Sequence, residues 1–223
     1  MVSRGMDARE FTWISNGFSI DEISESVALN TCAESRLPDD QFIVGHFGSI
    51  GCANALSVLF NAAEMLQNNQ GISFVLVDDG RDKLILQAIA ADKGLTNIRI
   101  LDPIPKVQVH EMISKFSVCY IDSLDSDLYK FGIAANIIFD YMSAGIPIVH
   151  AYFGAFDLLI GAKAGLGMPA EDSESLAMAI QQFYKMVPEE RAQFGVNGKK
   201  VAFSDYKYPE LSIRLANALF AND

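Results

Sequence analysis

The residue types best suited to ligand chemistry gather in one stretch, from Asp122 to His150. A polar loop there reaches Gly132, and a helix is predicted to follow; its first N–H groups, near Asn136 and Ile137, have no partner within the helix. Those groups and the positive end of the helix dipole suit a pyrophosphate. Asp140 shares a helix face with Asn136, four residues earlier, and its carboxylate can accept two hydrogen bonds from a ribose diol. Periodicity alone favours a plainer interpretation, a solvated helix charge and an ordinary first-turn residue.

Two turns that follow predicted strands are further candidates. Gly48 and Ser49 lie in a glycine-rich turn where a backbone can approach a ligand closely. Their spacing is not that of the G-x-G-x-x-G fingerprint, and such a turn is often only a tight connection. Ile104, Pro105 and Lys106 belong to a stiff Pro-Ile-Pro-Lys loop. Its fixed backbone can recognise the edge of a nucleobase, or the prolines can simply punctuate the chain.

Candidate cations and bases are few. Lys83 follows Asp78-Asp79-Gly80, so its ammonium is placed to meet a phosphate, unless it is a solvent-facing helix cation. His46 lies within a predicted strand and is interpreted as a packed core residue. The chain has no recognisable Ser-His-Asp elbow, Walker-type loop or H-E-x-x-H motif. No self-sufficient catalytic centre is therefore predicted, and the catalytic residues stay unknown.

The elements that must position these residues alternate between short apolar runs and longer amphipathic segments. This alternation is typical of βαβ units, and strands apolar on both faces indicate a parallel sheet covered by helices on both sides. Strands are predicted at Phe42–Phe47, Ser73–Val77, Asn97–Leu101, Ser117–Ile121, Pro147–Ala151 and Gly165–Met168. Helices are predicted at Ala53–Leu66, Asp82–Lys93, Val107–Phe116, Ala134–Ala144, Ser173–Lys185, Glu189–Phe203 and Pro209–Phe220.

Such a sheet also predicts where a ligand binds. In open α/β sheets ligands lie outside the carboxyl ends of the strands. The candidate loops are therefore 48–52, 78–83, 102–106, 122–133 and 152–157. The first forty residues differ in composition and are interpreted as an extension with a short helix and a linker. We expect a main domain over 41–205 and a C-terminal helix over 206–223.

Composition excludes several classes of protein. The net charge is −11, without the clustered Lys and Arg that a nucleic-acid groove needs. The acidic balance also argues against a membrane-binding patch on this chain. Three scattered cysteines without a C-x-x-C pair indicate reduced thiols in a cytoplasmic protein. There is no Cys/His cluster to indicate a metal site.

Six segments, in order, resemble the carboxy-terminal domain of group 1 (family 4) GT-B glycosyltransferases. The resemblance runs from about Trp13 to the end of the chain. GIAANIIFDYMSAGIPIV, the most specific segment, is similar to the family's GxSPNKLFDYMAAGKPVV. FVLVDDGRDKLIL resembles VGDGxxKxxL, and GLGMPAEDSESLAMAI resembles GLxVPPEDPEALAxAI. The other three segments are WISNGFS, FIVGHFGSIGCANAL and ILDPIPKVQVHEMI.

The resemblance implies a Rossmann-like parallel sheet of about six strands, one half of a GT-B fold. It also implies a nucleotide-sugar donor as substrate, UDP-sugar favoured over GDP-sugar, with no cofactor and no metal. By position, Asp140 corresponds to the second acidic residue of the family's E-x7-E element, which binds the ribose, and Asp127 is the candidate for the first. The backbone near Asn136 and Ile137 corresponds to the diphosphate contact. The first glycine turn corresponds to Gly48 and Ser49, and the nucleobase loop to Ile104, Pro105 and Lys106.

The sequence departs from the family where charge matters. The family's Arg and Lys after the first strand have no counterpart in Ser49–Asn54, and the lysine of PNK is replaced by Ile137. Lys83, Lys106 or Lys130 are candidates to compensate. The first glycine of GDG is Asp78.

The resulting hypothesis is the donor-binding half of a retaining glycosyltransferase for bacterial surface polysaccharide. This half is expected to be inactive without an N-terminal GT-B domain, through which any contact with the inner membrane would be made. The alternatives are a non-catalytic GT-B-like pseudo-enzyme or interaction partner, and an epimerase of the UDP-sugar type.

Overall fold

A computed structural model describes residues 12–50, 55–121, 123–124, 127, 135–151 and 157–220 of the 223-residue chain. Within these residues the strands form one parallel sheet of six, in the order β3-β2-β1-β4-β5-β6. The chain thus moves outward from β1 to one edge and then returns to extend the other edge. The strands are β1 (Phe42–Phe47), β2 (Ile72–Val77), β3 (Ile98–Leu101), β4 (Val118–Ile121), β5 (Ile148–Ala151) and β6 (Gly165–Met168).

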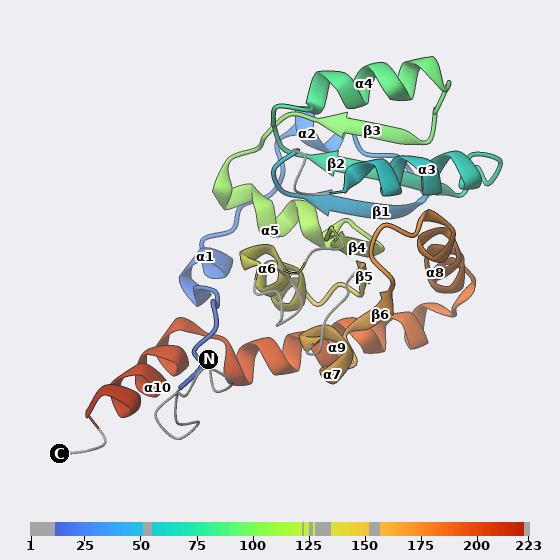
Figure 1. Ribbon diagram of the computed structural model, residues 1–223. Helices are drawn as coiled ribbons and strands as arrows, with labels where there is room; N and C mark the ends of the chain where they lie inside the picture. Colours follow the sequence, from blue (N-terminus) through green and yellow to red (C-terminus); the bar gives the residue numbers. More distant parts are fainter. Residues whose placement is uncertain are drawn as a thin grey trace.

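Helices cover both faces of the sheet, as the apolar strands predict (Figure 1). One hydrophobic core packs α3 and α8 against the sheet, together with α4 at its edge. The other packs α5, α6 and α9 against the opposite face. The helices are α1 (Ile20–Ser24), α2 (Thr31–Glu34), α3 (Leu56–Leu66), α4 (Lys83–Asp92), α5 (Lys106–Ser114), α6 (Asn136–Ala144), α7 (Leu158–Gly161), α8 (Ser173–Lys185), α9 (Pro188–Asp205) and α10 (Tyr208–Phe220).

Local sequence signals explain where several helices begin and end. Asp172 caps α8, because its Oδ1 accepts a hydrogen bond of 2.9 Å from the Ser175 N–H. Pro188 opens α9 at a position where a missing N–H costs nothing. Gly145 ends α6 in the left-handed conformation, with φ of 76°, which glycine adopts without steric penalty. The predicted fold class, an α/β Rossmann-like sheet, is confirmed.

The segment before the sheet is packed onto the domain from Phe18 onward. Phe18, Leu29 and Leu37 are buried in the core on the α5–α6–α9 face. Phe18 also pairs with the junction between α9 and α10: its N–H donates to Tyr206 O, and its carbonyl accepts from the Tyr208 N–H, both at 3.1 Å. The four-residue helices α2 and α7 were not predicted from the sequence, because a single turn has too few residues to show a helical period of hydrophobicity.

Candidate functional site

The sheet order brings most of the predicted site residues to one edge. Parallel strands end together, so the segments after β1, β3 and β4 meet at the carboxyl side of the sheet, where β1 and β4 form the topological switch point. Gly48 and Ser49 directly follow β1. The described candidates beyond them are Ile104, Pro105 and Lys106 at the start of α5, and Asn136, Ile137 and Asp140 in α6. Gly132 and Lys130 lie outside the described residues.

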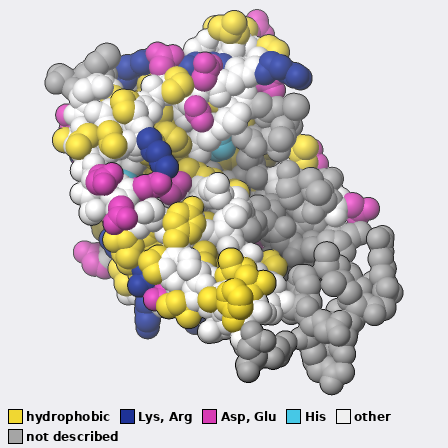
Figure 2. Space-filling model, turned by 90° about the vertical axis from the view of Figure 1, so that its left-hand side faces the viewer, with side chains coloured by type: hydrophobic (Ala, Val, Ile, Leu, Met, Phe, Trp, Pro, Cys, Tyr) yellow, Lys and Arg dark blue, Asp and Glu magenta, His cyan; other side chains and the backbone are white. Residues whose placement is uncertain are grey.

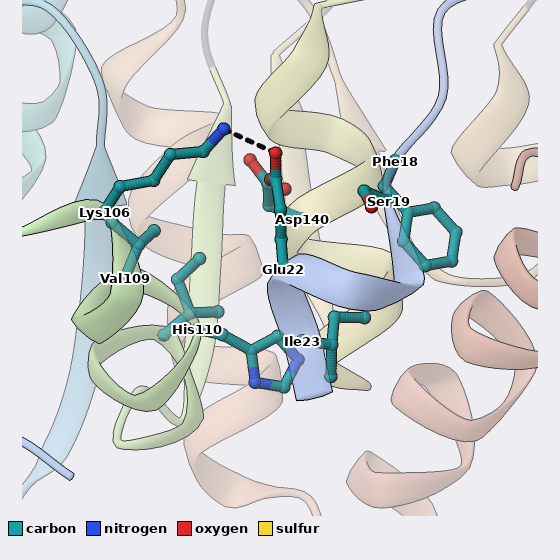
Figure 3. A pocket seen from close by; sticks show the side chains of 9 residues that line it. Phe18, Ser19, Glu22, Ile23, Lys106, Val109, His110 and Asp140 are labelled. Carbon is teal, nitrogen blue, oxygen red and sulfur yellow. Dashed lines mark hydrogen bonds and ion pairs between the residues drawn. The ribbon is translucent and has the colours of Figure 1, made fainter. Parts of the chain in front are cut away.

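A small cavity opens between α1, α5 and α6 (Figure 3). Its volume is about 50 Å³. Two residues predicted independently, Lys106 and Asp140, meet there. Glu22 of α1 faces both of them, a residue that the sequence analysis did not single out. The other lining residues are Phe18, Ser19, Ile23, Val109, His110 and Ile113.

Charge is unevenly balanced around this cavity. The Lys106 Nζ lies 2.5 Å from Glu22 Oε1, and that hydrogen bond raises the pKa of Lys106. Burial and, to a smaller extent, the negative charge of Glu22 raise the pKa of Asp140 to about 6, although the positive charge of Lys106 opposes both. The Asp140 carboxylate is therefore ionised at neutral pH, but only by a narrow margin. It is a hydrogen-bond acceptor suited to hydroxyl groups.

The N-terminus of α6 supplies N–H groups at the same edge. Ala135 precedes the helix with extended backbone and makes no side-chain cap, and the first turn of α6 contains no acidic residue. The N–H groups of Asn136 and Ile137 thus lie at the positive end of the helix dipole without a nearby carboxylate on α6 to neutralise it. This is the geometry that favours an anion, as the sequence pattern predicts.

Tyr141 fixes α6 relative to the end of β1. Its phenol oxygen accepts a hydrogen bond of 2.7 Å from the Phe47 N–H and donates one of 3.3 Å to the Phe47 carbonyl. Phe47 is the last residue of β1, beyond the two positions at which β1 pairs with β4. The buried Tyr141 side chain therefore takes the place of a strand partner at the switch point and sets the position of the adjacent Asp140.

Lys83 lies at the end of the second strand, where its spacing in the sequence predicts a cation. It is buried rather than solvent-facing, and its Nζ donates to Asp78 O at 3.1 Å and to Leu101 O at 3.3 Å. It also pairs at 2.9 Å with Asp102, and hydrogen bonds from Lys83 and then Arg36 lower the pKa of that carboxyl. The ammonium thus joins the carboxyl ends of β2 and β3.

The turns after β1 and β2 are locked together near Lys83. The Ile50 N–H donates to Asp79 O at 3.0 Å, and the Asp82 N–H donates to Ile50 O at 3.2 Å. A Cβ added at Gly80 would lie 2.0 Å from Ile50 O, so only glycine fits between the two turns. Gly48 is partly buried and Ser49 exposed at this end of β1.

His46 lies beneath the Gly48 turn. Both of its ring nitrogens are buried, and burial lowers its pKa to about 4. A neutral imidazole in an apolar core needs no counter-charge, and this agrees with the packed-core interpretation from the sequence. A Cβ built at Gly48 would lie 3.9 Å from His46 Nε2, so the ring is close to the ligand edge of the sheet.

The fold is a doubly wound α/β domain, and its candidate site lies at the strand-order reversal. The model of the family described as "Glycosyl transferases group 1" matches residues 30–201. The chain belongs to this family. No curated protein sequence matches it with significance.

Solved structures give the same fold. The Anabaena Alr3699/HepE structure in complex with UDP has a TM-score of 0.77 at 18% identity, over 99% of this chain and 60% of that one. A glycosyltransferase from Rickettsia africae ESF-5 has a TM-score of 0.78 at 12% identity, over 98% and 59%. WaaG, a glycosyltransferase involved in lipopolysaccharide biosynthesis, has a TM-score of 0.69 at 16% identity, over 96% and 56%. The chain therefore spans about 60% of the length of the first of these structures.

In the described part of the chain, no three His, Cys, Asp or Glu side chains gather as a set of metal ligands. No helix among the described residues is both long and apolar enough to cross a membrane.

Proposed function

We propose that this chain binds the nucleotide-sugar donor of a retaining glycosyltransferase, with UDP-sugar favoured over GDP-sugar. The observation that carries the proposal is the position of Asp140, half-buried in a cavity between α1, α5 and α6 and beside the loop at Ile104–Lys106. A carboxylate there suits a ribose diol, and the backbone of the loop suits a base edge. The Anabaena relative bound to UDP, and the same protein bound to UDP-glucose, support this choice of donor.

In this proposal the diphosphate lies toward the N-termini of α6 and α3, near Gly48 and Ser49. The charge that develops on the departing nucleoside diphosphate is stabilised by N–H groups and the helix dipole, without a metal ion. Asn136 and Ile137 supply such groups from α6. Lys83 contributes by holding the ends of β2 and β3, and its ammonium becomes available to phosphate only if it leaves those carbonyls.

The transferase activity itself, of hexosyltransferase type, is proposed to need a second domain that brings the acceptor. The relatives' greater length supports this partner. So does α10, which extends from the domain in Figure 1 and exposes a set of apolar side chains that Figure 2 shows on the lower part of the ligand face. They are Tyr208, Ile213, Leu215, Leu219 and Phe220. Alone, the chain is proposed to be inactive.

We place the whole enzyme in the cytoplasm, in bacterial surface polysaccharide biosynthesis, with a peripheral contact at the inner membrane made by the other domain. The likeness to WaaG supports this assignment.

A second function, a non-catalytic GT-B-like protein or interaction partner, is favoured by one observation. Ser49–Asn54 contains no cation, and the nearby Lys83 ammonium is engaged by protein acceptors. A site of this kind keeps the fold and loses the phosphate charge partners that catalysis uses.

Calorimetric titration of the chain with UDP and with GDP tests the proposal. We expect binding of UDP in the micromolar to millimolar range and weaker binding of GDP. Asp140→Ala is expected to weaken UDP binding by about 10- to 150-fold, the effect of losing hydrogen bonds to a charged group worth about 1.5–3 kcal/mol. Asp92→Ala, at the exposed end of α4, is the matched control and leaves the affinity unchanged. Absence of binding to either nucleotide at millimolar concentration would favour the non-catalytic function.

A further inference from the structure

Helix α1 places the carboxylate of Glu22 opposite Asp140, and the function proposed above gives this residue no role. Glu22 lies in the chain 84 residues before Lys106, yet its side chain reaches the same cavity. Figure 3 shows the Glu22 side chain reaching up from α1 to lie beside Asp140 of α6, with the Lys106 ammonium approaching from α5. The negative charge of Glu22 acts on Asp140, so the two carboxylates are close in space and do not merely overlap in the view.

Backbone hydrogen bonds on both sides of α1 hold Glu22 in place. Before the helix, Phe18 is paired on both sides with Tyr206 and Tyr208. After the helix, the Val27 N–H donates to Val107 O at 2.9 Å, and Gln108 Nε2 donates to the Ala28 carbonyl at 3.1 Å. The wall that carries Glu22 is therefore fixed to α5 and α9 independently of the Glu22–Lys106 ion pair, and it remains when that pair opens.

The charges of the cavity select a kind of chemical group. Two carboxylates and one ammonium face it among the described residues, which gives a net charge of −1 when all three are ionised. That net negative charge repels a phosphate. Hydroxyl groups are neutral, so they can donate hydrogen bonds to the carboxylates without electrostatic repulsion. The cavity, at about 50 Å³, admits a pair of hydroxyls but not a whole nucleoside.

We propose that Glu22 is a specificity residue of the donor site, and that Glu22 and Asp140 together bind the vicinal diol of the ribose from opposite walls. This inference rests on the proposed donor-binding function and adds to it a residue from the segment that precedes the sheet. Each carboxylate accepts one hydroxyl hydrogen. Lys106 is the counter-charge beside the two carboxylates, and its exposed side chain moves aside as the ligand enters.

The test is a thermodynamic cycle in which the Glu22 carboxylate is removed from the protein and the two ribose hydroxyls are removed from the ligand, separately and together. Binding of UDP and of 2′,3′-dideoxy-UDP is measured by calorimetry on the wild-type chain, on Glu22→Gln and on Glu25→Gln. Glu25 is the matched control because it is exposed, ends the same helix and does not line the cavity. Glu22→Gln keeps the size of the side chain at an exposed position, so the fold is not at risk.

We expect Glu22→Gln to weaken UDP binding about tenfold and to leave dideoxy-UDP unchanged, while Glu25→Gln changes neither. Equal affinity of wild type and Glu22→Gln for UDP would overturn the inference and leave the donor-binding proposal standing. Tighter binding by Glu22→Gln would also overturn it, because Glu22 would then be an obstacle that competes with the ligand. No binding of UDP to the wild-type chain would overturn both proposals together.

Discussion

Two corners of the ligand edge of the sheet contain charged residues and use them in opposite ways. In the cavity corner, formed by Glu22, Lys106 and Asp140, the charged groups border open space. The turn corner is formed by the turns after β1 and β2 together with Lys83. There the Lys83 ammonium is buried and donates hydrogen bonds to carbonyl groups at the ends of two strands. A lysine at a predicted ligand edge is therefore not by itself evidence of a ligand contact.

Residues of the turn corner maintain the structure of the site, whereas residues of the cavity corner are those we propose to bind the nucleotide. Substitutions in the turn corner are expected to lower the free energy of unfolding and leave the affinity of the folded protein for nucleotide intact. Substitutions in the cavity corner are expected to do the reverse, because Glu22 and Lys106 are exposed and contribute little to stability. Four predictions follow this division, from the largest expected effect to the smallest.

Gly80→Ala is expected to be the most destabilising change. Its Cβ would lie 2.0 Å from the Ile50 carbonyl oxygen, so the two turns must separate. Overpacking of this kind costs about 1–3 kcal/mol, and the upper end corresponds to a Tm lower by about 6–12 °C for a chain of this size. Thermal unfolding measures the effect. Gly161→Ala is the control, because a Cβ there meets nothing within 4 Å; equal Tm values for the two variants would show that the turns are not locked.

Lys83→Met is expected to reduce stability by about 1–3 kcal/mol, since the Asp78 and Leu101 carbonyls lose their donor. UDP affinity at a temperature where the variant is fully folded should stay within about twofold of wild type. Denaturant unfolding and calorimetry measure the two quantities. Lys93→Met, which removes a surface ion pair with Glu64, should cost less than about 1 kcal/mol. A tenfold loss of UDP affinity in Lys83→Met alone would instead make Lys83 a phosphate ligand.

Affinity for UDP-glucose is expected to fall as pH decreases from 7 to 5. Burial, followed by the charge of Glu22, raises the pKa of Asp140 to about 6, so at pH 5 only about a tenth of it is ionised, and affinity drops about tenfold. UDP-glucose is the suitable ligand because its diphosphate diester does not titrate in this range. The sign for stability is opposite: the folded state binds the extra proton between the unfolded pKa of 3.8 and about 6, so Asp140 favours folding at low pH and disfavours it above 6. A flat affinity profile from pH 7 to 5 would remove Asp140 from the binding step.

Tyr141→Phe is expected to produce the smallest change, because it lies between the two corners. The Phe47 N–H loses its 2.7 Å partner, which costs about 1 kcal/mol in stability and shifts α6 only slightly. UDP affinity should decrease no more than about threefold. Chemical denaturation and calorimetry check both values. A loss of affinity as large as that of Asp140→Ala would mean that the phenol itself contacts the ligand.

Much of the fold could be predicted from the sequence because it rests on local patterns. The run Phe42–Phe47 and the stop at Gly145 gave β1 and the end of α6 correctly. Asp140 could be chosen as a site residue because a motif of one helix contains it. Glu22 could not be chosen in this way, since its place beside Asp140 depends on how the N-terminal segment folds back onto α5. Such a long-range contact leaves no periodic pattern in the local sequence.

Lys83 shows the same limit from the other side. Its spacing after Asp78-Asp79-Gly80 indicates a cation at the strand ends, and the structure places it there. Which acceptors take its hydrogen bonds depends on the neighbouring strand β3 and on Asp102, 19 residues further along the chain. Sequence spacing predicts the position of a charged group more readily than its partner.

The most direct test of the account is a map of amide NMR shifts on adding UDP to the ¹⁵N-labelled chain. We predict that the largest changes occur at Glu22, Ile104, Lys106 and Asn136–Asp140, and that the amides of Asp82–Leu86 change little. The largest changes at Asp82–Leu86, with the amides around Asp140 unaffected, would contradict the assignment of the nucleoside to the cavity corner.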